Sequence, residues 1–373
     1  MDFSFTEEQQ MLLDTTRRFI AERYDFDYRN GVRASEQGWS PEVWSQLADL
    51  GLLAVNVPEA DGGIGAGALG TMLVSNAIGE GLLLEPFLAS AVVATQAIAT
   101  IGSEAQRARW LPALSTGECI AVLAHEETST RDDPMAIEAR AERDGEGYRI
   151  SGRKAGIYHA PAAKLLLVSA RTQDGKVGLF AIDPGSSGVS LEPCRTVDEQ
   201  PAADVTLDAV LVEADAVLSS DAGAALQDVL DYGLAALCGE AFGAMDRILA
   251  ATIEYSRARV QFGQPIGRFQ ALQHRMAEML MHLEQARSMC YLAAAQCGNP
   301  ELGERRAALS AAKALMGQSA RYIGQQSVQL HGGMGMTDEL NVSHYFKRLL
   351  AFELRCGTTD WHLEHYRLRM QAG

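Results

Sequence analysis

A break between two helical stretches gathers the side chains of this sequence that are best suited to bind a ligand. The stretch "SRARVQFGQPIGRFQALQ", residues 256–273, has helical sequence on both sides but is interrupted by two glycines and a proline. The chemically useful side chains around the interruption are Arg259, Gln261, Phe262, Phe269 and Gln270. An arginine can bind a phosphate through two parallel hydrogen bonds, aromatic rings offer flat apolar walls, and amides both donate and accept hydrogen bonds.

Two interpretations of this stretch follow from the residues alone. In the first, Gly263 and Gly267 let the backbone approach a ligand closely. A dinucleotide with a pyrophosphate and an aromatic base would then use every polar and aromatic group of the stretch. In the second, the stretch is a simple turn between helices whose polar groups satisfy one another. Both interpretations stay open at this point.

Three regions of different periodicity must position these groups. Residues 1–118 have apolar side chains at helical spacing, and Thr6 is expected to cap the first helix. Residues 119–218 are short, alternating stretches separated by turn sequences such as "DPGSSG", which predicts a compact antiparallel β-domain. Residues 219–373 return to helices of about thirty residues, which predicts a four-helix bundle. The expected fold is therefore mixed α and β.

Composition and charge exclude several classes of partner. The chain has 373 residues, with 32 Lys and Arg against 48 Asp and Glu, which gives a formal charge of −16. Phosphate backbones and anionic lipids repel such a chain, so neither nucleic acid nor a membrane is expected as a partner. The six cysteines form no Cys-x-x-Cys pair, and the first residues carry no secretory signal, which together indicate a cytoplasmic protein. The uncharged stretch Pro86–Ser103 is rich in alanine and is predicted to be a packed interior helix.

Two short patterns look chemical but are weak signals. Residues 65–70 match G-x-G-x-x-G, but helical sequence precedes them and no strand returns after the next helix. We therefore expect a glycine-rich turn instead of a dinucleotide site. His362 and His365 lie three residues apart in "HLEH", but no further ligand cluster is near, so a solvated helix face is expected and no metal site is predicted.

Two longer motifs resemble one known family. From Arg259 to Met279 the pattern R-x-Q-F-G-x-P-I-x-x-F-Q-x-x-Q-x-x-x-A-x-M is similar to the signature of acyl-CoA dehydrogenases. Further on, "QLHGGMGM" (Gln329–Met336) is similar to the Gln-x-x-Gly-Gly-x-Gly segment of that family. The resemblance covers essentially the whole chain, which is identified as a member. It implies an N-terminal α-helical domain, a middle antiparallel β-domain and a C-terminal four-helix bundle.

The resemblance implies that the broken helix clamps the FAD of a neighbouring subunit and not the chain's own FAD. Ten residues would contact that FAD: Arg259, Gln261, Phe262, Ile266, Phe269, Gln270, Gln329, Leu330, Gly332 and Gly333. Within this set, Arg259 would hold the pyrophosphate with Gln261 and Phe262 beside it. The residues from Ile266 to Gln270 would line the adenosine portion. The residues from Gln329 onward would come from the next helix end, where the ligand lies on backbone.

The residue that would act as the catalytic base departs from the family pattern. The family's reaction is the α,β-dehydrogenation of an acyl-CoA thioester, in which a glutamate takes the α-proton and the flavin takes the β-hydride. At the position of that glutamate this chain has Cys356, and a buried thiol is a poor substitute for a tuned carboxylate. Some relatives carry the glutamate at a position that falls on Gly233. The nearest acid there, Asp231, faces another side of its helix and is expected to be solvated or salt-bridged.

The part of the family site that holds a chain's own flavin ring also departs. The loop Thr-Glu-Pro-x-x-Gly-Ser-Asp of the family corresponds to "HEETSTRD", residues 125–132. The Trp-Ile-Thr stretch that backs the ring corresponds to Gly156, Ile157 and Tyr158. The resemblance therefore implies an intact clamp for a neighbour's flavin and a degraded seat for the chain's own.

This division favours a subunit of a heteromeric acyl-CoA dehydrogenase. The assembly expected is an α2β2 tetramer, in which a second acyl-CoA dehydrogenase-like chain brings the base and the flavin-ring loop. Small subunits that resemble this chain act on pimeloyl-type or steroid side-chain CoA thioesters, and an electron-transferring flavoprotein is the expected electron acceptor. The alternatives are a self-sufficient homotetramer that uses Asp231 as its base and a non-catalytic scaffold with the same fold.

Overall fold

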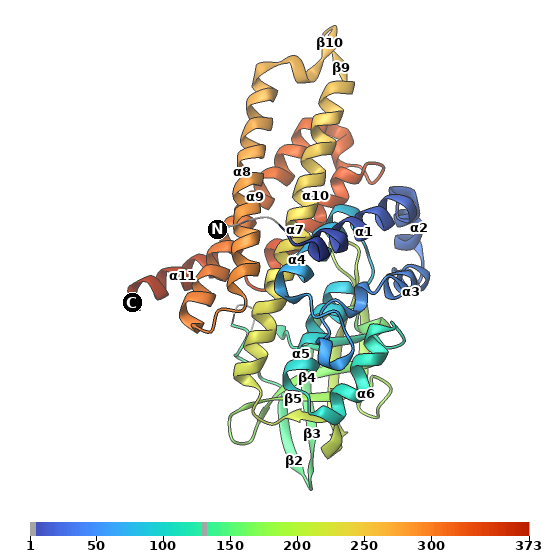
Figure 1. Ribbon diagram of the computed structural model, residues 1–373, viewed down its shortest axis with the longest axis vertical. Coiled ribbons are helices and arrows are strands. Elements are labelled where there is room, and N and C mark those ends of the chain that lie inside the picture. The colour runs from blue at the N-terminus through green and yellow to red at the C-terminus, as the bar shows by residue number, and fades with distance from the viewer. Residues whose placement is uncertain (1–4, 129–132, 373) are drawn as a thin grey trace. The chain divides into compact units, whose positions relative to one another are not determined.

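The computed structural model describes residues 5–128 and 133–372, and the chain divides into two compact units. One unit comprises Met1–Arg29, Met72–Leu83 and Leu234–Gly373, and the other comprises Asn30–Thr71 and Leu84–Gly233. Segments from both ends of the chain thus belong to the first unit. Figure 1 shows the order of helices and strands along the chain.

The first unit contains the first helix and most of the C-terminal helices. The helices that lie in it, wholly or in part, are α1 (Glu7–Arg23), α2 (Phe26–Ala34), α4 (Gly67–Gly81), α7 (Gly223–Ala258), α8 (Gln270–Gln296), α9 (Leu302–His331), η8 (Gly332–Met336), α10 (Asn341–Leu354) and α11 (Thr359–Ala372). Thr6 caps α1 as predicted, because its hydroxyl accepts a hydrogen bond from the backbone of Gln9 at 3.2 Å. The Gln9 side chain accepts in return from the backbone of Thr6 at 3.0 Å, which completes a capping box.

Helix α9 packs against α8, α10 and α11 in this unit. The helices approach closely because small residues lie at the contacts: a side chain at Gly324 would meet the ring of Phe346 at 2.8 Å. A buried ion pair also joins α7 to α10, with 2.6 Å between Glu240 Oε1 and Arg348 Nη1. The predicted bundle of long C-terminal helices is therefore present.

The second unit combines short helices with a β-sheet. Its helical elements include α3 (Pro41–Asp49), η1 (Leu52–Ala54), η2 (Glu59–Asp61), η3 (Phe87–Ala94), α5 (Thr95–Ile101), α6 (Glu104–Ser115), η5 (Ala160–Ala162) and η6 (Ala214–Ala216). The uncharged stretch predicted as an interior helix forms η3, which is a π-helix, and α5. Val92 and Ile98 from this stretch are fully buried, the latter in the apolar core shared with the sheet. Among the described helices, none is long and apolar enough to cross a membrane.

The strands form one sheet with mixed pairing. The strands are β1 (Ala121–Ala124), β2 (Arg140–Asp144), β3 (Gly147–Tyr158), β4 (Leu165–Thr172), β5 (Val177–Ile182), β6 (Val189–Arg195), β7 (Pro201–Val212) and β8 (Val217–Ser219). The sheet runs β6-β7-β3-β2-β4-β5-β8, with β1 added beside β4. Most neighbours are antiparallel as predicted, but β1 and β2 both pair with β4 in parallel. The antiparallel description therefore needs this correction at β4.

The glycine-rich stretch at residues 65–70 is a turn only at Gly65 and Ala66, because residues from Gly67 onward already form the start of α4. It leads from η2 into α4, and Gly65 and Gly67 adopt φ of +62° and +66°, a region that glycine enters at little cost. No strand in the described chain comes before it, so the strand–turn–helix context of a dinucleotide motif is missing.

Candidate functional site

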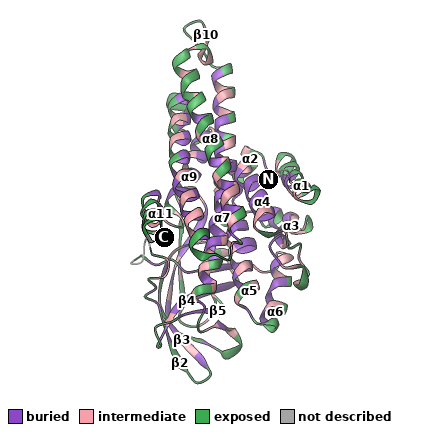
Figure 2. Cartoon of the chain, turned by 60° about the vertical axis from the view of Figure 1, so that its left-hand side comes forward, coloured by how far each residue is buried: buried purple, intermediate pink, exposed green. Residues whose placement is uncertain are grey.

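The broken helix of the sequence is a β-hairpin between α7 and α8. Strand β9 (Val260–Gln261) pairs antiparallel with β10 (Gln264–Pro265), and the short helix η7 (Ile266–Arg268) leads into α8. Phe262 and Gly263 form the turn with φ of +55° and +79°. Two positive φ values are typical of a tight hairpin turn, but a phenylalanine there is strained, at a cost of order 1 kcal/mol. Figures 1 and 2 show this hairpin as the exposed end of α7 and α8.

The hairpin brings together the first six predicted contact residues. The ring of Phe262 is 91% exposed and meets Phe269 edge-on, with 6.0 Å between the ring centroids. The backbone of Ile266 donates to the carbonyl of Arg259 at 2.8 Å, which closes the hairpin against the end of α7. The guanidinium of Arg259 is exposed and has no hydrogen-bond or ion-pair partner among the described residues. Gln261 and Gln270 are also exposed.

The other four predicted residues lie at the end of α9 and the start of η8. His331 stacks on Tyr255, one turn before Arg259, with 4.2 Å between the ring centroids. A side chain built at Gly332 or Gly333 would meet no atom within 4 Å, so the backbone there is open to a ligand. Gln329 is exposed, whereas the Leu330 side chain is buried, so Leu330 can offer only its backbone.

These observations fit the ADP half of FAD at the hairpin end. An exposed arginine can bind a pyrophosphate, an exposed phenylalanine offers a face to stack on, and two open glycines leave space for the ligand. All of these groups belong to the first unit.

The position that the resemblance assigns to the catalytic glutamate lies in a turn between α10 and α11. Cys356 and Gly357 have φ of +54° and +90°. Nε2 of His362 donates to the carbonyl of Cys356 at 2.7 Å, and Nζ of Lys313 donates to the carbonyl of Gly357, also at 2.7 Å. Cys356 is exposed, so the expectation of a buried thiol is wrong. The turn is held in place, but it presents a thiol where the family presents a carboxylate.

The histidine that holds this turn corrects a second expectation. His362 was predicted to lie on a solvated helix face, but it is 3% exposed. Its ring lies against Ser310 of α9, with 3.3 Å between Nδ1 and the hydroxyl. Burial lowers the pKa of His362 to about 3, and the nearby Lys313 adds to this effect. His362 is therefore neutral and acts as a fixed donor to the turn.

The alternative base position, on α7 at Gly233 and the nearby Asp231, is closely packed. Asp231 was expected to be solvated or salt-bridged; it is 6% exposed, so it is not solvated, and it accepts a hydrogen bond from Gln227 at 3.4 Å. A Cβ at Gly233 would lie 2.9 Å from Val93 Cγ2 of η3. Helix α7 and η3 thus pack too closely at this point for a glutamate side chain.

The segment that would seat the chain's own flavin ring is tied down by a buried polar network. Residues 129–132 of the predicted loop lie outside the described residues, but His125 and Glu127 are both buried. Lys154 of β3 is completely buried and places Nζ 2.6 Å from Glu127 Oε1 and 3.1 Å from Ser169 Oγ. The Ser169 hydroxyl also meets His125 Nδ1 at 2.9 Å.

The network also fixes the backbone that follows the loop. The Glu127 carboxylate accepts from the backbone of Glu138 at 2.7 Å and of Ala139 at 3.1 Å. Burial raises the pKa of Glu127, but the hydrogen bond and charge of Lys154 outweigh it, and the net shift is downward. Burial lowers the pKa of Lys154 to about 8 and that of His125 to about 4.

This network was missed in the sequence. Lys154 lies four residues from Ile150, which is also buried on β3, and this even spacing on a strand was the available signal. The positions that back the flavin ring in the family are small or occupied differently here. Gly156 has φ of +61° and donates to Asp204 at 2.8 Å.

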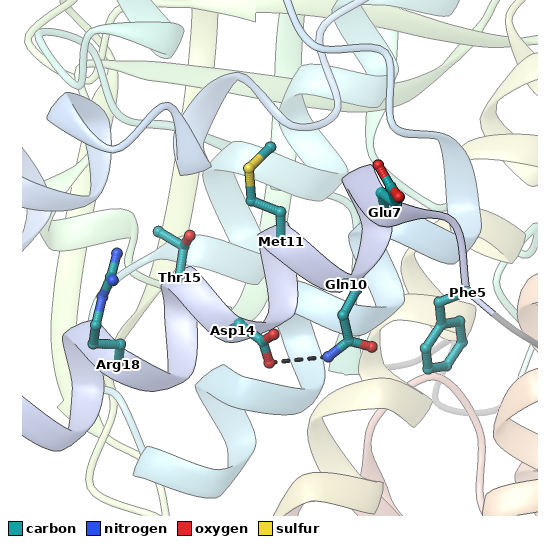
Figure 3. Close-up of a pocket in the computed structure, with 7 residues that line it drawn as sticks. All are labelled: Phe5, Glu7, Gln10, Met11, Asp14, Thr15 and Arg18. Atoms are coloured by element: carbon teal, nitrogen blue, oxygen red, sulfur yellow. Dashed lines mark hydrogen bonds between the residues drawn. The ribbon is translucent and has the colours of Figure 1, made fainter.

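An open hollow on α1 has no comparable chemistry. It measures about 770 Å³ and is lined by seven residues of α1 and its approach, drawn in Figure 3. Met11, Thr15 and Arg18 project to one side of the helix, and Gln10 and Asp14 project to the other and bond each other at 2.9 Å. Side chains that diverge from one helix do not converge on a ligand, so this surface is not a candidate site.

Family sequence models match almost the entire chain. The acyl-CoA dehydrogenase N-terminal domain matches residues 6–118, the middle domain residues 122–210 and the C-terminal domain residues 223–370. The chain belongs to the acyl-CoA dehydrogenase family. Members of this family are FAD-dependent oxidoreductases.

Individual relatives agree with this assignment. Acyl-CoA dehydrogenase FadE12 of Mycobacterium tuberculosis is 30% identical over 357 residues, which cover 92% of this chain and 91% of the relative. Among solved structures, the Tcur3481–Tcur3483 steroid ACAD variant is similar with a TM-score of 0.90 and 30% identity, covering 98% of each chain. The ChsE4–ChsE5 complex from Mycobacterium tuberculosis is similar with a TM-score of 0.90 and 25% identity, covering all of both chains.

Proposed function

We propose that this acyl-CoA dehydrogenase chain is the base-less subunit of a heteromeric enzyme and supplies the flavin clamp to a catalytic partner chain. The proposal rests on a difference between two parts of the family's flavin site within this one chain. The clamp is open and exposed, with Arg259 unpaired among the described residues, whereas the base position holds Cys356 and the ring segment is closed on Lys154.

The exposed apolar residues around the clamp support an assembly. Phe262 is 91% exposed, Met336 75% and Val260 54%, and these residues lie on the hairpin and on η8. Clusters of exposed large apolar side chains are typical of surfaces that become covered by a ligand or a partner. Two of the similar solved structures carry names that combine two gene products, the ChsE4–ChsE5 complex and Tcur3481–Tcur3483.

The roles within the assembly follow from the division of residues. The partner contributes a glutamate that takes the α-proton of the acyl-CoA and the loop that seats the ring. FAD held at this site would supply the acceptor for the β-hydride, and an electron-transferring flavoprotein would receive the electrons. The ten clamp residues of this chain hold the ADP half of that FAD. The small subunits that this chain resembles act on steroid side-chain or pimeloyl-type CoA thioesters.

Co-expression with a candidate partner that carries the glutamate tests this proposal. The chain alone should purify with little flavin and should not oxidise acyl-CoA with an artificial electron acceptor. The assembly should contain one FAD per two chains, because only the partner seats the ring. Arg259→Ala should weaken FAD retention in the assembly by about 2–4 kcal/mol, since the pyrophosphate loses its charged partner.

The same measurements can overturn the proposal in favour of the homomeric alternative. Turnover by the chain alone at ordinary dehydrogenase rates, abolished by Asp231→Asn, would identify Asp231 as the base. The burial of Asp231 beside Gln227 argues against that outcome. Full flavin occupancy of the assembly with both Arg259→Ala and Gly333→Val would show that the clamp is assigned to the wrong residues.

A further inference from the structure

A groove of about 500 Å³ lies between the ends of α7 and α8, beside the hairpin. Its walls come from the last turns of α7, from β10 and η7, and from the first half of α8. Ile253, Met276 and Leu280 give it an apolar surface, and Leu280 is 48% exposed. None of the ten clamp residues is among the described residues that line it. The groove is therefore a separate feature at the same end of the helices.

Two arginines of the groove have no partner in the part of the chain that the structure describes. Arg257 and Arg268 are both exposed, and neither guanidinium makes a hydrogen bond or an ion pair with any residue that the structure describes. Residues 254–275 contain four arginines and a single acid, Glu254, which gives +3 in a chain whose formal charge is −16. Arginine side chains fork onto phosphate and carboxylate groups, so this groove favours an anionic ligand.

The remaining polar side chains of the groove offer acceptor oxygens. Gln273 donates one amide N–H to the carbonyl of Gly267 at 2.8 Å, which leaves its second N–H and its amide oxygen available. Ser256 donates its hydroxyl proton to the carbonyl of Thr252 at 2.8 Å, so its oxygen can only accept. A ligand that satisfies these oxygens must itself carry N–H or O–H groups.

We propose that the groove binds an adenine nucleoside diphosphate. The phosphates bind Arg257 and Arg268, and the flat base lies on the apolar surface formed by Ile253, Met276 and Leu280. The amino group of the base and the hydroxyls of the ribose supply donors to Gln273 and Ser256. A volume of about 500 Å³ is within the usual range for small-molecule sites. An acidic helix of another protein would bring carboxylates, but its backbone donors are already used within the helix.

Calorimetric titration of the purified chain with ADP tests this site without any partner subunit. ADP should bind with one site per chain, and Arg257→Ala and Arg268→Ala should each weaken binding about tenfold, as expected for the loss of one charged hydrogen-bonding group. Arg18→Ala, an exposed arginine on α1, is the matched control and should leave the affinity unchanged.

Competition separates the sources of the nucleotide. CoA carries the same diphosphate and base, so displacement of ADP by CoA would identify the substrate's nucleotide end as the ligand, whereas failure to displace it would identify a free nucleotide. Absence of ADP binding at millimolar concentration would overturn the proposal. Equal loss of binding in Arg259→Ala would place ADP in the clamp and also overturn it. A change of oligomeric mass in Arg257→Ala with ADP binding unaltered would make the groove a protein interface.

Discussion

The buried pair of Lys154 and Glu127 gives the sharpest test of how the ring segment is held. Nζ of Lys154 lies 2.6 Å from Glu127 Oε1, and the two side chains are 0% and 3% exposed. Glu127→Gln keeps the size of the side chain and one oxygen for the backbone of Glu138 or Ala139, but it leaves the ammonium without its counter-charge. Removal of one partner from a buried ion pair costs about 3–5 kcal/mol, and we expect a value near the lower end.

The measurement is the free energy of unfolding in urea at pH 7, with an exposed pair as control. Arg153 Nη2 lies 3.2 Å from Glu192 Oε2, and these side chains are 57% and 69% exposed. Glu192→Gln should therefore cost less than about 1 kcal/mol. If Glu127→Gln costs no more than Glu192→Gln, the ion pair does not hold the segment and the reasoning is refuted.

The pH dependence of the same variant has a definite sign. Burial lowers the pKa of Lys154 to about 8 from its ordinary 10.5, so the folded state binds this proton more weakly than the unfolded state does. The contribution of Lys154 to the free energy of unfolding is thus unfavourable at low pH and disappears as the pH rises toward 10.5. Loss of Glu127 lowers the pKa of Lys154 further. The difference in the free energy of unfolding between the wild-type chain and Glu127→Gln should therefore become smaller as the pH rises through about 8, where Lys154 loses its charge.

Three other changes test separate parts of the molecule. Gly333→Val should leave the melting temperature of the chain alone unchanged, because its Cβ meets no atom within 4 Å, but it should reduce the flavin content of the assembly. Burial lowers the pKa of His362 to about 3, so protonation of His362 should destabilise the folded state as the pH falls from about 6.5 toward 3. The loss in the free energy of unfolding should reach about 4 kcal/mol at pH 3. In urea unfolding, His362→Asn should therefore show a smaller dependence of this free energy on pH. Gly233→Glu places a glutamate where some relatives have their base. It should lower the free energy of unfolding by about 1–3 kcal/mol, because the new Cβ would lie 2.9 Å from Val93 Cγ2. Val93→Ala in the same chain should recover part of this loss.

The parts of the fold that depend on neighbouring residues could be predicted from the sequence. Thr6 and Gln9 are three residues apart, and that spacing alone specifies a capping box. The change from helical to alternating periodicity near residue 119 likewise reports the change from helices to strands. The interruption after α7 was recognisable because glycine and proline break helices locally. In the structure this interruption forms the hairpin of β9 and β10.

The parts that depend on distant segments could not be predicted. The parallel pairing of β1 with β4 joins strands that are 44 residues apart in register, Ala121 with Leu165. The burial of His362 arises because α9 covers it with Ser310, and nothing within "HLEH" reports that cover. The same applies to Glu127 and Lys154, whose side chains meet only because β3 and the segment after β1 are brought together by the sheet.

The concentration of arginines at the hairpin end has a consequence for the kinetics of assembly. A chain of formal charge −16 that carries +3 within residues 254–275 has a strongly asymmetric field. A second acidic chain is repelled by most of this surface and is attracted over about 8 Å, the screening length at physiological salt, only when it approaches that end. Encounters are therefore oriented before contact, and the association rate should fall as salt is added even though the two net charges have the same sign.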